Sequence, residues 1–127
     1  MACSGLVVER DPLPDAAARR NVEDRHARLR LGLVAVYGWY ERNAQLTSCV
    51  LRDAEYHPLT KEIFELRHGR PMAACQAVLG AKLGARQRAV LRLALSFFTW
   101  RTLVREAGLT SAAAAKAMAR AIEGAAA

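Results

Sequence analysis

The side chains that could act as nucleophiles, bases or metal ligands are three histidines and three cysteines in a sequence of 127 residues. They are His26, His57, His68, Cys3, Cys49 and Cys75. None of them lies in an HExxH or CxxC pattern, and no set of carboxylates accompanies them at the spacing of metal ligands. A glycine-rich phosphate loop and a GxSxG elbow are also missing from the sequence. We therefore expect a protein that is not an enzyme, with no catalytic residues, no metal and no cofactor.

The cysteine count is odd and no secretory signal precedes the cysteines, which argues against a disulfide framework. Cys49 and Cys75 are interpreted as small core residues. No uncharged stretch approaches the ~20 apolar residues that a membrane-spanning helix needs. These features predict a soluble, cytoplasmic protein with no membrane partner.

Aromatic residues form the more informative set. They are Tyr37, Trp39, Tyr40, Phe64, Phe97, Phe98 and Trp100. Two interpretations remain open for them. They form the core of a helical bundle, or they line a pocket between helices in which tyrosine hydroxyls and an indole N–H orient a ligand.

The elements that must position these side chains are helices. The sequence is rich in alanine and 53% hydrophobic, and it has no runs of β-branched or aromatic residues typical of strands. Pro12 and Pro14 make residues 1–20 a short helix and a loop. Residues 21–127 are then one all-α domain. The apolar spacing predicts helices over 21–42, 44–55, 58–83, 85–107 and 110–124.

Local signals mark the ends of these helices. Asn21 is the expected N-cap of the first, and Asn43 is expected to end it and cap the second. Gly69 and Pro71 predict a kink within the third. Gly32 and Gly38 lie inside the first helix, where a glycine lets another helix or a ligand come close. The residues expected to face inward on the second and third helices are Leu46, Cys49, Val50, Leu59, Ile63, Phe64 and Leu66.

The segment 85–107 has a single polar stripe, and nearly all its other residues are apolar. An apolar arc that wide indicates a central helix or a helix that meets a second subunit. Gly108 is a helix stop of the Schellman kind, and Thr110 caps the last helix. The apolar edge of that helix consists of Ala114, Met118, Ala121 and Ile122, whose small members permit close helix contact.

The net charge of +7 raises the possibility of nucleic-acid binding. The arginines, however, are spread from Arg10 to Arg120, and most lie beside Glu or Asp at helical spacing. This pattern favours a solvated surface.

Two stretches resemble one family. VYGWYERNAQLTSCVLRDAE is similar to the helix pair that opens the ligand domain of many TetR-family transcriptional regulators. RLALSFFTWRTLVREAGLT is similar to their penultimate helix, with a Phe-x-x-Trp-x-x-Leu pattern at Phe97, Trp100 and Leu103. The opening ACSG and the following PLPD resemble the segment just after the DNA-binding domain of such proteins. The likeness covers nearly the whole chain, and its motifs are moderately specific.

The resemblance implies a five- to six-helix bundle that forms homodimers, with helices 85–107 and 110–124 of each subunit making an intersubunit four-helix bundle. A small hydrophobic or aromatic effector would bind among the preceding helices and change the affinity of the parent protein for DNA. The implied pocket residues are Tyr37, Tyr40, Phe64, Phe97 and Trp100. The implied interface residues are Leu91, Leu95, Phe98, Ala114, Met118 and Ile122. A helix-turn-helix would contact DNA, and residues 1–20 contain none, so we expect them to be a remnant of the junction to a missing domain.

Two alternatives stay open beside this interpretation. The first is a plain helical dimerisation module without a ligand. The second is a basic protein that binds nucleic acid without sequence specificity.

Overall fold

The computed structural model describes residues 13–14 and 23–126, and every regular element in these ranges is helical. The elements are α3 (Arg25–Tyr56), α4 (Pro58–Phe64), the π-helical turn η1 (Glu65–Gly69), α5 (Arg70–Leu79), α6 (Ala85–Ala94), α7 (Phe97–Arg101), the π-helical turn η2 (Thr102–Glu106) and α8 (Ser111–Gly124). The all-α prediction is confirmed. The helix and loop expected before residue 21, and the cap at Asn21, lie outside the described residues apart from Leu13 and Pro14.

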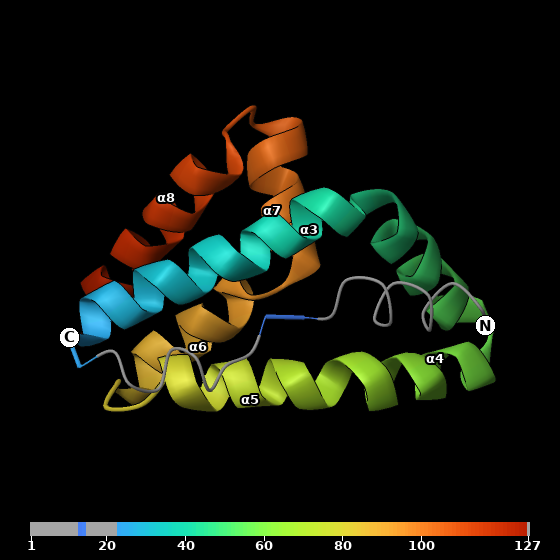
Figure 1. Ribbon diagram of the computed structural model, residues 1–127, viewed down its shortest axis with the longest axis horizontal. Helices are drawn as coiled ribbons and strands as arrows, with labels where there is room; N and C mark the ends of the chain where they lie inside the picture. The colour runs from blue at the N-terminus through green and yellow to red at the C-terminus, as the bar shows by residue number, and fades with distance from the viewer. Residues whose placement is uncertain (1–12, 15–22, 127) are drawn as a thin grey trace.

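The long helix α3 contacts α4, α5, α7 and α8 (Figure 1). Its first half packs along α8, and the segment α4–η1–α5 returns along the opposite side. Helix α6 contacts both α8 and α5, and helix α7 contacts α3. The core includes Leu29, Leu33, Val36, Tyr37, Trp39, Tyr40, Met72, Cys75, Leu79, Leu91, Leu95, Trp100, Ala115 and Ile122.

Side chains form hydrogen bonds with the backbone at the start of α3 and at its bend. Asp24, rather than Asn21, is the N-cap of the helix that is seen, because its carboxylate accepts a hydrogen bond from the His26 amide at 3.0 Å. The predicted break at Asn43 is confirmed as a bend, with φ −119° and ψ 18°. The Asn43 amide group donates to the Trp39 carbonyl at 2.9 Å. This hydrogen bond links the Asn43 side chain to the part of α3 before the bend.

The bend and the π-helical turn also explain errors in the expected inner faces. Beyond Asn43, Thr47 and Val50 are buried, whereas Leu46 is 42% exposed. Leu59 and Leu66 are both more than half exposed. The set of buried residues that is extrapolated at 3.6 residues per turn no longer holds beyond a bend. It also no longer holds beyond a π-helical turn such as η1. Ile63 and Phe64 are partly buried, and Cys75 further along is in the core.

The segment 85–107 is two helices rather than the one predicted. Helix α6 ends at Ala94, and the Ser96 hydroxyl accepts a hydrogen bond from the Phe98 amide as the N-cap of α7. The Thr99 hydroxyl donates to the Leu93 carbonyl at 2.6 Å and secures the turn. Because the chain changes direction here, its apolar residues face different neighbours within one chain. The wide apolar arc therefore needs no second subunit to explain it.

The expected stop and start near residue 108 are confirmed. Gly108 has φ +81°, and the Leu109 amide donates to the Leu103 carbonyl at 3.0 Å, which is the six-to-one bond of a Schellman motif. The Thr110 hydroxyl accepts from the Ala113 amide and caps α8. These contacts fix the turn that brings α8 back onto α3.

Two glycines of α3 are a matched pair for a stability test. A Cβ at Gly32 would lie 2.5 Å from the buried Leu79 side chain, whereas a Cβ at Gly38 would meet nothing closer than 3.5 Å. We expect Gly38→Ala to raise the free energy of unfolding by about 0.5–1 kcal/mol, because it removes a glycine from a helix interior. Gly32→Ala should lower it by about 1 kcal/mol, because overpacking against Leu79 exceeds the gain in helix propensity. Urea unfolding of both variants checks this, and shifts of the same sign would contradict it.

Candidate functional site

A cavity of about 240 Å³ lies where α3, the segment α4–η1–α5 and the α6–α7 turn meet. It is lined by Tyr40, Thr47, Leu51, Phe64, His68, Met72, Gln76, Arg92, Leu95, Ser96, Phe97 and Phe98. Three of the five predicted pocket residues are among them: Tyr40, Phe64 and Phe97. Tyr37 and Trp100, the other two, do not line it.

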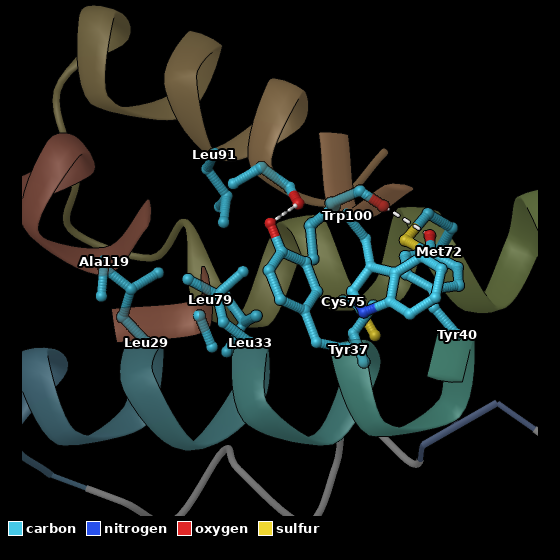
Figure 2. Packing of buried hydrophobic residues seen from close by; sticks show 14 of the residues in the cluster. Leu29, Leu33, Tyr37, Tyr40, Met72, Cys75, Leu79, Leu91, Trp100 and Ala119 are labelled. Carbon is cyan, nitrogen blue, oxygen red and sulfur yellow. Dashed lines mark hydrogen bonds between the residues drawn. The ribbon is translucent and has the colours of Figure 1, made fainter. Parts of the chain in front are cut away.

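The hydroxyl groups of Tyr37 and Tyr40 both donate hydrogen bonds within the fold. Tyr37 donates to the Ala94 carbonyl at 2.7 Å, and Tyr40 donates to the Leu95 carbonyl. Figure 2 shows the two bonds side by side. Carbonyls at the C-terminus of a helix lack a partner within it, so the break after α6 provides these acceptors. Burial raises the pKa of both phenols, which therefore stay protonated and continue to donate.

The indole N–H of Trp100 also donates a hydrogen bond within the chain. Its Nε1 donates to the Ser111 hydroxyl at 3.0 Å, and Ser111 in turn donates to the Glu41 carboxylate at 3.2 Å. The Trp100 side chain is 0% exposed. This N–H and the two tyrosine hydroxyls, which were expected to orient a ligand, each already donate to a partner within the chain.

Two residues of the cavity lining that our sequence reasoning missed, Thr47 and His68, each have a buried polar atom without a partner among the described residues. The Thr47 hydroxyl and the His68 Nδ1 are buried, and neither has a hydrogen-bond partner in the described parts of the chain. Leaving such a group unpaired costs about 1–3 kcal/mol, so most buried polar groups in proteins are paired. A bound molecule that completed these bonds would recover part of that cost.

The His68 ring is held by aromatic neighbours. It stacks on Phe64 with ring centroids 4.6 Å apart and lies 6.0 Å from the Trp39 ring. Burial lowers the pKa of His68 to about 4, so the imidazole is neutral near pH 7. A neutral imidazole has one nitrogen that donates and one that accepts, which suits a hydroxyl or an amide better than a charged group.

The π-helical turn η1 places His68, and a sequence signal for it existed. Pro71 has no N–H, and its ring clashes with the carbonyl four residues earlier in a regular helix. We interpreted Gly69 and Pro71 as a kink, whereas the chain widens into a π-helical turn over Glu65–Gly69. Such turns are frequent at functional sites. A search for polar residues just before Pro71 would have returned Arg67, His68 and Arg70.

The predicted interface residues divide into two groups. Leu91, Leu95, Ala114 and Ile122 are each at most 1% exposed and lie in the core of the single chain. The reason is that α8 packs on α3 and α6 of its own subunit. These four side chains are buried within the single chain and are not accessible to a second subunit in this structure. Met118 is partly buried, and Phe98 is 46% exposed beside the cavity.

Across residues 13–14 and 23–126 there is no group of three or more His, Cys, Asp or Glu side chains that could hold a metal ion. No helix within those ranges combines the length and the apolar character needed to cross a membrane. The chain matches no known protein family, no curated protein and no solved structure.

Proposed function

We propose that this domain binds a small, mostly apolar molecule with one neutral hydrogen-bonding group, in the cavity lined by Thr47 and His68. The observation that carries the proposal is the pair of buried, unpartnered polar atoms on Thr47 and His68. Most of the other lining residues are aromatic or aliphatic, and the remaining three are Gln76, Arg92 and Ser96. Ligand sites commonly combine apolar walls with a few polar groups that fix orientation.

The lining favours an aromatic or alicyclic body. Phe64, Phe97 and Tyr40 provide ring faces and edges, and Met72 is an adaptable apolar neighbour. Within the cavity, the hydrogen-bonding group of the ligand faces a hydroxyl and a neutral imidazole. A phenol, an alcohol or an amide satisfies both without the desolvation cost of a charge.

We further propose that the ligand is an effector and that the domain belongs to a TetR-type regulator, which acts as a homodimer in the cytoplasm.

 The support for this role is the resemblance of residues 36–55 and 92–110 to that family. DNA contact would belong to a helix-turn-helix domain that these residues do not provide. In this proposal the ligand-filled and empty forms differ in how α4–η1–α5 rests on α3, because the cavity lies between them.

A matched pair of ligands tests the proposal. 2-Naphthol and naphthalene share their rings and differ in one hydroxyl, and their dissociation constants can be compared by fluorescence titration. We expect 2-naphthol to bind about five- to tenfold more tightly, because one hydrogen bond contributes about 1 kcal/mol. Thr47→Val keeps the shape of the side chain and removes the hydroxyl, so it should reduce that ratio.

Thr102→Val is the control, because it removes an exposed hydroxyl outside the cavity lining. It should leave the ratio unchanged. Thr47→Val should not destabilise the unligated protein, because Thr47 loses no hydrogen bond. Absence of saturable binding of either compound, or a ratio near one in the unmodified protein, would contradict the proposal.

A further inference from the structure

A second recess, of about 320 Å³, lies between the bend of α3 and the α7–η2 segment. It is lined by Ala44, Gln45, Ser48, Phe97, Trp100, Arg101 and Arg105. Only Phe97 is shared with the lining of the first cavity. We propose that this recess binds a small oxyanion, a carboxylate or a phosphate, through the guanidinium groups of Arg101 and Arg105.

Aromatic rings hold both guanidinium groups in place. The Cζ of Arg101 lies 4.9 Å from the centroid of the Phe98 ring, and that of Arg105 lies 5.4 Å from the centroid of Trp100. A guanidinium group that rests its face on a ring keeps its N–H edge available for a planar or tetrahedral anion. The two arginines are four residues apart in sequence, so their side chains emerge about one helical turn apart.

No carboxylate neutralises these charges in the described parts of the chain. The ion pair between His26 and Glu123 involves neither Arg101 nor Arg105. The nearest acidic residue along the facing part of α3 is Glu41, which accepts a hydrogen bond from Ser111. The recess therefore has a positive charge that a bound anion would balance.

The facing wall adds two neutral donors. Gln45 and Ser48 lie about one turn apart on α3, and both line the recess. An amide N–H₂ and a hydroxyl opposite two guanidinium groups give a converging set of donors. This set differs in chemistry from the unpartnered polar groups of the first cavity, which are a hydroxyl and a neutral imidazole. The ligand is a small anion rather than a nucleic acid, because the donors converge on a recess between two helices instead of forming an extended basic stripe.

The test is a titration followed by amide chemical shifts, with inorganic phosphate in one arm and acetate in the other, at constant ionic strength set with sodium chloride. We expect saturable shifts at residues around the recess in at least one arm, and the arm that saturates at lower concentration identifies the anion class. Arg105→Gln should weaken that binding at least fivefold, and Ser48→Ala should weaken it two- to threefold.

Arg120→Gln is the matched control, since it removes the same charge from an exposed site on α8 outside the lining. It should leave the dissociation constant unchanged. Shifts that grow linearly in both arms, or equal losses in Arg105→Gln and Arg120→Gln, would overturn the proposal by showing non-specific attraction to a basic protein. Tight binding of duplex DNA to these residues, without saturation by either small anion, would also overturn it. Binding of 2-naphthol is measured separately, so failure here leaves the first cavity untouched.

Discussion

Trp100→Ala should lower the free energy of unfolding by about 3–5 kcal/mol, the cost typical of truncating a large buried aromatic residue. The Trp100 side chain is fully buried, and its ring lies 5.6 Å from Phe97 and 6.3 Å from Tyr40 between centroids. The substitution also removes the N–H that links α7 to Ser111 on α8. The substitution is therefore expected to lower the stability of the fold, independently of any change in the affinity for a ligand.

Urea unfolding measures this loss, and the fluorescence of Trp39, which is also buried, remains as a probe in the variant. Trp100→Phe is the companion variant, because it keeps a six-membered aromatic ring and removes the indole N–H together with the rest of the five-membered ring. It should cost less than half as much. A Trp100→Ala protein as stable as the unmodified one would show that this side chain is not part of the core.

Ile122→Ala should lower the free energy of unfolding by about 2–5 kcal/mol. Ile122 is 0% exposed and belongs to the core within one chain. If it lay between subunits instead, its truncation would chiefly shift the balance between monomer and dimer, and the effect would depend on protein concentration. We expect the same oligomeric state for the variant and the unmodified protein by analytical ultracentrifugation.

Met118→Ala provides the comparison on the same helix, because Met118 is only partly buried. It should cost clearly less stability than Ile122→Ala. A stable Ile122→Ala monomer obtained from a dimeric parent would contradict the placement of this residue in the core of the single chain.

The parts of the fold that could be predicted from sequence depend on local signals. The bend at Asn43, the stop at Gly108 and the cap at Thr110 all involve contacts within a few residues. The break at Ser96 was missed because a serine in a polar stripe is equally compatible with a helix surface. Ser96 acts as a cap because tertiary packing sets the direction of α7, and local sequence does not contain that information.

The candidate site could be predicted only in its apolar part. Tyr40, Phe64 and Phe97 line the cavity as expected. Which polar groups remain unpaired could not be predicted, because the answer depends on long-range contacts. The Tyr37 hydroxyl is used by a carbonyl 57 residues away, whereas Thr47 finds no partner at all among the described residues. Composition and spacing carry no information on such pairings.

We propose that the cavity binds a ligand through groups that the fold leaves unpaired. The ratio of the dissociation constants of naphthalene and 2-naphthol tests it most directly, in the unmodified protein and in Thr47→Val. We expect a ratio of about five to ten in the unmodified protein, and a ratio that falls toward one in the variant. A ratio that is the same in both proteins would contradict it.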